Sequence, residues 1–341
     1  MLAGVLISPG HLEMQEVERP VAGPGEVVLK VEAALTCGTD MKAFRRGHPK
    51  MPMPTLLGHE FSGTVEEVGS GVTRFKVGDQ VMSVHSAPCN SCFFCLRAQQ
   101  NLCESIMGTK ILGAYAEYIK LPRHIVEQNA FIKPPGLSFT EAAMLEPLAC
   151  VIYGLEQFPA GRGDTVVVIG AGPVGLLQAA ALREYGVKKV ILAGRHSIRL
   201  DAGLALGADT VIDVDKSDLL KEVLAETGSR GADLVIESTG RPDVWESTLS
   251  MVRKGGNVLL FGGCPEGSRA CFDTTRLHYN EITLKGVFHF TPSAVKKAYE
   301  MLSAGKIDVR PLITAELPLK ELPRAFEMLI AGEGIKYAII P

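Results

Sequence analysis

A glycine-rich turn directly after an apolar strand is the feature that most constrains this fold. The segment VVVIGAGPVG, residues 166–175, runs from β-branched residues into a turn that opens a helix. Its first glycine allows a tight turn, the second lets backbone approach a pyrophosphate, and the third lets the helix pack on the strand. The helix N-terminus favours a negative group through its free N–H groups and dipole. The segment predicts a dinucleotide site rather than a turn that serves packing alone. Its residues are Gly170, Gly172, Pro173, Val174 and Gly175.

The pattern of strand-like and helical segments changes near residue 160. Before it, short strand-like runs such as EVVLKVEAAL are separated by Gly, Pro, Asn and Asp turns, which is typical of a β-rich region. After it, the apolar runs KKVILA, ADLVIE and GGNVLLFGG alternate with helical segments. Such alternation predicts βαβ units on a parallel sheet, as in a doubly wound Rossmann domain. We therefore expect an α/β protein of two domains.

The end of the second Rossmann strand distinguishes NAD from NADP. An NAD site usually places Asp or Glu there to bind the ribose 2′-hydroxyl, whereas arginine suits a 2′-phosphate. Here the strand ends in Gly194 and Arg195, and Arg199 follows one helical turn later. Gly194 would leave room for a phosphate that guanidinium groups can bind bidentately. The sequence thus favours NADP through Arg195 and Arg199; the alternative is two solvated arginines and use of both cofactors.

Four cysteines lie within one short loop, at positions 89, 92, 95 and 103. Thiolates at this spacing can surround one tetrahedral Zn²⁺ ion, which is a structural site without an open coordination position. Bacterial ferredoxins also begin C-x2-C-x2-C but continue x3-C-P, whereas this loop continues x7-C and the chain has no second cluster. We expect Cys89, Cys92, Cys95 and Cys103 to hold a structural zinc ion that stabilises a lobe and does no chemistry.

Composition excludes several classes of function. The net charge of −3 comes without long runs of like charge, so no electrostatic footprint for nucleic acid or an anionic membrane exists. The first 20 residues lack the basic and apolar segments of a signal peptide, and no apolar run could span a bilayer. We expect a cytoplasmic protein, in a compartment where clustered cysteines hold metal more often than they form disulfides.

A second set of possible metal ligands is scattered along the first half of the chain. Cys37 lies in TCGTD, His59 and Glu60 in GHE, and Glu146 in LEPLAC. These residue types suit a catalytic zinc that keeps one position open for water or substrate. Singly, however, a buried cysteine or a hydrogen-bonded histidine is the more ordinary explanation. The residues alone leave open whether the four share a metal ion.

Together these motifs resemble the zinc-dependent medium-chain alcohol and polyol dehydrogenases, over essentially the whole chain. The shared stretches include PGEVVLKVEAALTCGTD, GHEFSGTVEEVGSGV, FKVGDQV, the four-cysteine loop, EPLAC and VVVIGAGPVGLLQ, in the family's order. Carboxylates in GHE and EP make the sorbitol and threonine dehydrogenase branch the most similar. The resemblance implies a GroES-like catalytic domain of residues 1–152 and 291–341, a Rossmann domain of residues 153–290, and a homo-oligomer, either a dimer or a tetramer.

The resemblance also implies roles for the scattered residues. Cys37 and His59 match direct ligands of catalytic zinc. Glu60 matches a glutamate that binds the metal in some members and states. Glu146 matches a further carboxylate, which binds the metal ion either directly or through a water molecule.

Three residues match groups that take part in catalysis in this family. Thr39 matches the hydroxyl that relays the substrate proton, Asp40 the carboxylate that orients the zinc-bound histidine, and Glu60 the glutamate beside it. The implied reaction is the oxidation of a secondary alcohol, in a polyol or sugar alcohol, to a ketone by reversible hydride transfer to NAD(P). Two alternatives stay open: a zinc-free enone or quinone reductase on this fold, and a cofactor-binding protein without turnover.

Some positions depart from the family's patterns. His289 and Phe290 stand where sorbitol dehydrogenases tend to carry Arg-Tyr, and Met41 and Lys42 stand where threonine dehydrogenases carry a histidine. Both departures put the substrate in doubt. Three basic residues follow the cysteine of TCGTD, namely Lys42, Arg45 and Arg46. They could bind the phosphate of a phosphorylated sugar alcohol, although a solvated basic face is the simpler interpretation. The substrate pocket is expected around Phe44, His48, Leu112 and Phe288.

Overall fold

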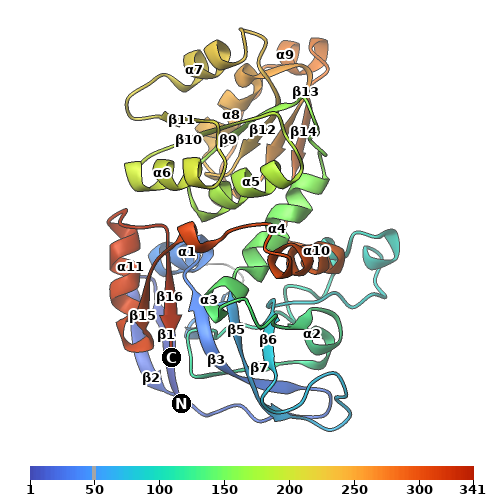
Figure 1. The fold of residues 1–341 in the computed structure, drawn as a ribbon, viewed down its shortest axis with the longest axis vertical. Coiled ribbons are helices and arrows are strands. Elements are labelled where there is room, and N and C mark those ends of the chain that lie inside the picture. The colour runs from blue at the N-terminus through green and yellow to red at the C-terminus, as the bar shows by residue number, and fades with distance from the viewer. Residues whose placement is uncertain (48–50) are drawn as a thin grey trace. The chain divides into compact units, whose positions relative to one another are not determined.

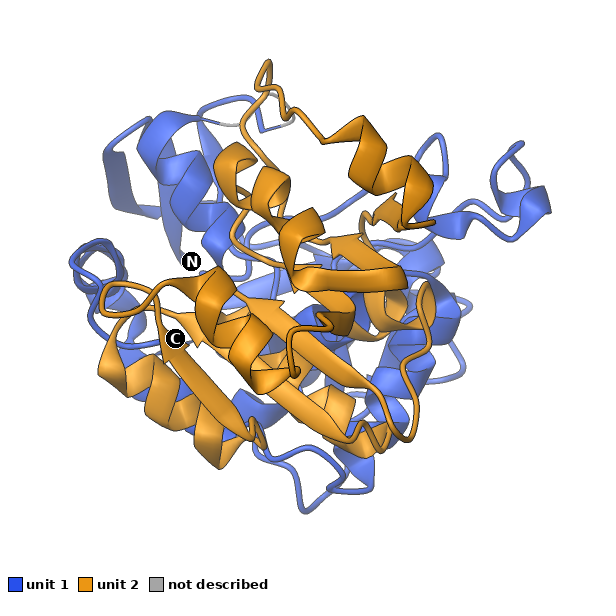
Figure 2. Ribbon diagram, turned by 90° about the horizontal axis from the view of Figure 1, so that it is seen from above, with its two compact units in different colours: residues 1–150, 290–341 blue, residues 151–289 orange. Residues whose placement is uncertain are grey.

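The computed structural model describes residues 1–47 and 51–341 and divides the chain into two compact units. Unit 1 comprises Met1–Cys150 and Phe290–Pro341, and unit 2 comprises Val151–His289 (Figure 2). The domain boundaries expected from the sequence lie one or two residues later at each junction. Within the described residues, no helix is both long enough and apolar enough to cross a membrane.

Unit 2 is built on a six-stranded parallel sheet in the order β11-β10-β9-β12-β13-β14. The chain starts at the centre with β9, moves outward to one edge and then returns to build the other. This order is the doubly wound arrangement whose switch point, between β9 and β12, is where dinucleotides bind. The predicted Rossmann sheet is therefore confirmed. Its strands are β9 (Thr165–Ile169), β10 (Lys189–Gly194), β11 (Thr210–Asp213), β12 (Ala232–Glu237), β13 (Val252–Leu260) and β14 (Thr283–Gly286).

Helices cover both faces of this sheet, with α5 and α6 on one side and α8 on the other (Figure 1). All five residues of β9 are buried, as expected for a central parallel strand covered on two faces. The apolar run that precedes the glycine turn is thus the centre of the unit 2 core. The helices are α5 (Pro173–Glu184), α6 (Ser197–Ala205), α7 (Leu219–Glu226), α8 (Pro242–Met251) and α9 (Thr274–Tyr279).

Unit 1 is the β-rich part predicted from the first 150 residues, completed by the end of the chain. A seven-stranded sheet has the order β15-β16-β3-β5-β6-β8, with β7 also paired to β3, and a second sheet has the order β2-β1-β4. Its strands are β1 (Leu2–Ser8), β2 (His11–Glu16), β3 (Val27–Leu35), β4 (Thr55–Leu56), β5 (Phe61–Val68), β6 (Gln80–Ser83), β7 (Tyr118–Leu121), β8 (Ala130–Ile132), β15 (Ile313–Pro318) and β16 (Lys336–Ile340).

Short helices connect these strands and pack on the sheet. They are α1 (Gly38–Arg46), α2 (Arg123–Gln128), α3 (Phe139–Ala142), α10 (Pro292–Ser303) and α11 (Leu322–Ile330), with single 3₁₀ turns at Cys95–Arg97, Gln100–Leu102, Arg310–Leu312 and Leu319–Glu321. Helix α4 (Leu145–Glu156) begins in unit 1 and ends in unit 2.

Strand pairing in unit 1 brings distant parts of the sequence to one end of the sheet. Strand β3 lies between β16 and β5 and is antiparallel to both (Figure 1), with Ala34 opposite Phe61 and Leu35 opposite Ala338. The end of β3 therefore lies beside the beginnings of β5 and β16. The segments that precede or follow these strand ends carry Cys37, His59 and Glu60.

Candidate metal centres and nucleotide site

The structure brings together three of the scattered ligand candidates. One ligand atom from each of Cys37, His59 and Glu60 lies within 4.8 Å of the others. His59 and Glu60 are buried, at 6% and 1% exposure. Cys37 caps the N-terminus of α1 and accepts a hydrogen bond from the Thr39 N–H at 3.5 Å. This set, the Cys37–His59–Glu60 cluster, has the chemistry of a zinc site made of sulfur, imidazole and carboxylate.

Asp40 fixes the orientation of His59. Its Oδ1 lies 3.2 Å from His59 Nδ1, and Asp40 is fully buried. The second carboxylate oxygen accepts a hydrogen bond from the Tyr115 hydroxyl at 2.7 Å, and that hydroxyl also lies 3.0 Å from the Leu35 carbonyl. A carboxylate on one ring nitrogen leaves Nε2 to bind a metal ion. The arrangement fits the orienting role expected for Asp40, and Tyr115 is a member that sequence reasoning missed.

Opposite charges inside the cluster shift its pKa values. Burial alone would lower the pKa of His59, but Asp40 and Cys37 beside it raise that pKa well above its ordinary value. Burial and the Glu60 charge raise the pKa of the Cys37 thiol, against the lowering effect of His59. Because zinc binds thiolate and neutral imidazole, loading this cluster must displace protons. Metal affinity should therefore fall as the pH falls.

Glu146 lies beside the cluster but outside the group whose atoms meet within 4.8 Å. Its Oε1 accepts a hydrogen bond from the Cys150 thiol at 3.6 Å and lies 3.5 Å from His85 Nδ1. Burial raises the pKa of Glu146 to about 7, while His59 opposes that rise. Its metal role thus stays a prediction. The His85 ring also packs edge-on against the His59 ring, with 5.1 Å between centroids, and sequence reasoning missed it.

The structure distributes the remaining residues that were expected near the substrate over several parts of the fold. Thr39 is exposed at the start of α1, and Lys42, Arg45 and Arg46 are exposed along that helix, which fits a solvated basic face. Phe44 and Leu112 pack against the hydrophobic core of unit 1. Phe290 is buried against the His85 ring, Phe288 and His289 belong to unit 2, and His48 lies outside the described residues.

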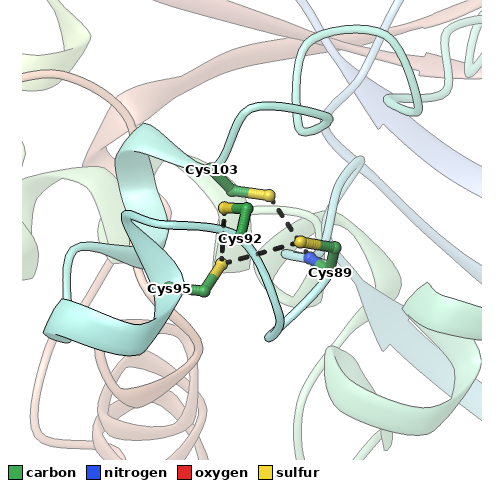
Figure 3. A group of neighbouring side chains, drawn as sticks. All are labelled: Cys89, Cys92, Cys95 and Cys103. Carbon is green, nitrogen blue, oxygen red and sulfur yellow. Dashed lines mark hydrogen bonds between the residues drawn. The ribbon is translucent and has the colours of Figure 1, made fainter.

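The four cysteines of the loop converge on one point (Figure 3). Sγ of Cys95 lies 3.5 Å from that of Cys92 and 4.0 Å from that of Cys89, and the Cys89 N–H points at Cys103 Sγ from 3.3 Å. None of the four forms a disulfide. Tetrahedral zinc with bonds of about 2.3 Å requires sulfur atoms about 3.8 Å apart. The spacing of this set, the cysteine lobe, fits that requirement.

The local backbone and side chains of the lobe prepare some of its thiols for metal. Hydrogen bonds from Ser91 lower the pKa of Cys89 to about 5, and backbone N–H groups lower the pKa of Cys92. Burial raises the pKa of Cys95 to about 12. Cys89 is thus a thiolate at neutral pH, and the thiol of Cys92 loses its proton more readily than a free thiol, whereas Cys95 would require the metal ion itself to lose its proton.

The glycine turn has the geometry of a pyrophosphate site. Gly170 has a φ of +119°, which side chains rarely adopt, and a Cβ on Gly175 would lie 1.8 Å from the Gly170 carbonyl oxygen. Around Gly172 no heavy atom lies within 4 Å of such a Cβ. Gly172 also caps α5 without any side-chain hydrogen bond, and Pro173 is the first helical residue. The open backbone before the helix can therefore receive an anion.

The structure changes the explanation of Gly194. A Cβ there would lie 2.3 Å from the Ala171 Cβ, so close packing against the glycine turn, rather than room for a phosphate, explains the glycine. Arg195 is exposed, and its Nε lies 3.0 Å from Asp215 Oδ1. Arg199 is half-buried, and burial lowers its pKa. Since exposed ion pairs are weak, Arg195 can leave Asp215 for another anion.

Two family models match the chain, one on each part of the fold. The alcohol dehydrogenase GroES-like domain matches residues 23–130, and the zinc-binding dehydrogenase domain matches residues 173–304.

Curated relatives match over nearly their full length. Sorbitol dehydrogenase of Bacillus subtilis (strain 168) is 30% identical, over 100% of this chain and 97% of the relative. L-threonine 3-dehydrogenase of the same organism is 32% identical, over 96% and 94%.

Solved structures share the whole fold. A zinc-binding dehydrogenase from Sinorhizobium meliloti 1021 bound to NADP has a TM-score of 0.91 at 29% identity, covering 100% of this chain and 99% of its own. An alcohol dehydrogenase from Escherichia coli CFT073 complexed with NADH has a TM-score of 0.88 at 25% identity, with the same coverage. The chain belongs to the zinc-dependent medium-chain alcohol and polyol dehydrogenases, as its motifs predicted.

Proposed function

We propose that this protein oxidises a secondary alcohol, in a polyol or sugar alcohol, to a ketone and transfers the hydride reversibly to a nicotinamide cofactor. The observation that carries the proposal is the Cys37–His59–Glu60 cluster, which is buried at His59 and Glu60, with Asp40 bonded to His59. Its donor set matches zinc, and its second-layer carboxylate is the usual support of a zinc-bound histidine. Similarity to sorbitol and threonine dehydrogenases supports the substrate class.

Cys37 and His59 are the proposed direct ligands of a catalytic zinc ion, with Glu60 and Glu146 as neighbouring carboxylates. When bound there, the ion supplies a Lewis acid that polarises an alcohol oxygen. Asp40 holds the His59 ring in the orientation that metal binding needs. Thr39 is exposed near Cys37, and we assign it the relay of the alcohol proton to water.

A second zinc ion is proposed for the cysteine lobe. All four positions of a tetrahedral ion would be filled by sulfur, so no substrate could reach the metal. We assign this ion a structural role only. Thiols of this kind stay reduced in the cytoplasm, which is the location we propose, and the family resemblance suggests a dimer or tetramer of identical chains.

The cofactor is proposed to bind at the carboxyl end of β9. Backbone from Gly170 to Gly175 would receive the pyrophosphate at the N-terminus of α5. Arg195 and Arg199 would then contact a 2′-phosphate, so we favour NADP, and the NADP bound in the S. meliloti neighbour supports this choice. The NADH bound in the E. coli neighbour keeps NAD as the second candidate.

Neither of the two alternative functions explains the Cys37–His59–Glu60 cluster. A zinc-free enone or quinone reductase has no use for Cys37, His59 and Asp40 brought together in this way. A cofactor-binding protein without turnover would be stabilised thermally by NADP but would convert no alcohol or ketone.

The proposed function is tested with a panel of polyols and their ketones, each assayed with NADP and NAD at equal concentration. We expect at least one polyol–ketone pair to be interconverted, faster with NADP than with NAD. Absence of turnover with every pair, in protein that carries zinc and binds NADP, would contradict the proposed function. A preference of tenfold or more for NAD, about 1.4 kcal/mol, would overturn only the cofactor assignment.

Replacing Arg195 with alanine tests the cofactor assignment directly. We expect the KM for NADP to rise about tenfold, because a charge-assisted contact is lost and Asp215 is left as a like charge. The KM for NAD should change little. Arg310→Ala is a matched control, since Arg310 is an exposed arginine paired with Asp308 in unit 1. Equal KM changes for the two cofactors would show that Arg195 does not contact the 2′-phosphate.

A further inference from the structure

Glu237 is a fully buried carboxylate at the carboxyl end of β12, in unit 2. A buried carboxylate is costly unless hydrogen-bond donors or a positive group compensate it. Burial raises the pKa of Glu237, while hydrogen bonds from Thr239, Gly240 and Trp245 oppose that rise. The partners of Glu237 therefore show what this charge holds in place.

The carboxylate of Glu237 binds the loop that directly follows β12. Its Oε1 accepts hydrogen bonds from the Thr239 N–H at 2.6 Å, from the Thr239 hydroxyl and from the Gly240 N–H at 3.1 Å. Its Oε2 lies 3.2 Å from the same Gly240 N–H, and Gly240 has a φ of +70°. Each of these partners is a donor. An ionised carboxylate only accepts, whereas a glutamine amide would turn an NH₂ group toward a donor.

The same residue holds the loop that follows β13. The Glu237 carbonyl accepts hydrogen bonds from the Phe261 and Gly262 N–H groups, both at 2.9 Å. A Cβ on Gly262 would lie 2.3 Å from the Gly240 nitrogen and 2.9 Å from Glu237 Oε2. The two loops therefore pack backbone to backbone beside the carboxylate, and Glu237 fixes one relative to the other.

The loop after β12 also contacts the proposed pyrophosphate turn. A Cβ on Gly170 would lie 3.1 Å from Thr239 Cγ2 and 3.3 Å from the Ser238 carbonyl carbon. The Ser238 N–H donates to the Ile169 carbonyl at 2.9 Å, and its hydroxyl donates to the buried Gln178 of α5 at 2.7 Å. The loop thus lies at the switch point between β9 and β12, where a doubly wound sheet binds its dinucleotide.

A dinucleotide spans the two mononucleotide-binding halves of a doubly wound sheet. The half formed by β9, β10 and β11 carries the glycine turn together with Arg195 and Arg199, which we proposed for the adenosine end of the cofactor. The loops that Glu237 holds follow β12 and β13, in the other half. That half is left for the nicotinamide end.

We infer that Glu237 is a positioning residue for the cofactor, which holds the loops after β12 and β13 in the arrangement that receives the nicotinamide half of the dinucleotide. The inference deepens the proposed function and rests on it, because it requires the pyrophosphate to bind at the glycine turn.

A purely structural role for Glu237 makes a different prediction. Removing buried hydrogen bonds would destabilise unit 2 in either case, so a lower melting temperature does not separate the two roles. A positioning role affects one half of the cofactor, whereas a general loosening of unit 2 would weaken the binding of both halves.

The test measures by calorimetry how tightly the wild type and Glu237→Gln bind a dinucleotide and its adenosine fragment. NADP is paired with 2′,5′-ADP and NAD with AMP, since each fragment lacks the nicotinamide half. The pair whose dinucleotide binds the wild type more tightly is used. Asp233→Asn is the matched control, because Asp233 lies near the other end of β12, where its carboxylate accepts the Thr165 N–H at 2.8 Å.

We expect Glu237→Gln to bind the dinucleotide about tenfold more weakly, the effect of losing a hydrogen bond to a charged group, and to bind the fragment as the wild type does. Asp233→Asn should bind both ligands as the wild type does. If Glu237→Gln does not fold, Thr239→Val decides in the same titrations, because it removes the hydroxyl that donates to Glu237.

Three results would overturn the inference: equal weakening of dinucleotide and fragment, no weakening of either, or the same selective loss in Asp233→Asn. A wild type that binds neither dinucleotide would overturn the proposed cofactor site itself, whatever Glu237 does.

Discussion

Cys37→Ser should abolish turnover while leaving a folded protein. The substitution removes the proposed thiolate ligand, and losing several kcal/mol of transition-state charge stabilisation corresponds to at least about a 10³-fold fall in kcat/KM. Serine is a favoured N-cap residue, so the cap that Cys37 provides to α1 should be kept. Turnover, zinc content and thermal unfolding measured on the same preparation check this result.

The matched control is Cys271→Ser, because Cys271 is an exposed cysteine in unit 2. It should keep full turnover and full zinc content. Turnover of Cys37→Ser within tenfold of wild type, about 1.4 kcal/mol of barrier, would mean that Cys37 is not a catalytic ligand.

Cys95→Ala should have the largest effect on stability. Among the described residues, the hydrophobic cluster of the lobe consists of Cys95, Cys103 and Ile106, with Cys92 and Met107 packed against it. Such a small cluster cannot replace a structural metal ion, since metal-binding energy is folding energy in domains of this kind. Loss of about 3 kcal/mol from unit 1, which has roughly 200 residues, would lower the melting temperature of that unit by roughly 6–12 °C. Thermal unfolding and zinc content per chain measure the effect.

The effect of Cys95→Ala on turnover distinguishes the role of the cysteine lobe from that of the Cys37–His59–Glu60 cluster. Cys95→Ala should lose one zinc ion and still turn over substrate at temperatures where it is folded. Cys264→Ala, at a half-buried cysteine of unit 2, is the control. A folded Cys95→Ala protein that is as inactive as Cys37→Ser would mean that the cysteine lobe takes part in the chemistry.

The features formed by residues close together in the sequence were the most predictable. The glycine turn and the cysteine lobe each lie within 16 residues of sequence, so their ligand or backbone geometry follows from spacing and turn residues. The parallel sheet followed from the alternation of apolar runs with helical segments. The expected reason for a glycine at position 194, room for a phosphate, was wrong. The sequence does not show that Ala171 fills the space beside Gly194.

Features that depend on long-range pairing could not be predicted in the same way. Lys336 and Glu60 are 276 residues apart and meet only because β3 pairs with both β5 and β16. Tyr115 contacts Asp40 across 75 residues. One signal was present: Lys336 stands at the start of an otherwise apolar strand, and a lysine buried at such a position requires a charged partner.

The most direct measurement follows turnover while zinc is removed stepwise by a chelator and counted per chain. Two ligand groups lie within the part of the chain that the structure describes, the cysteine lobe and the Cys37–His59–Glu60 cluster, and they predict two zinc ions per chain. The ion with an open position should leave first, so turnover should disappear as the zinc content falls from two to one, before the fold is lost. Turnover that persists in zinc-free protein would contradict the account.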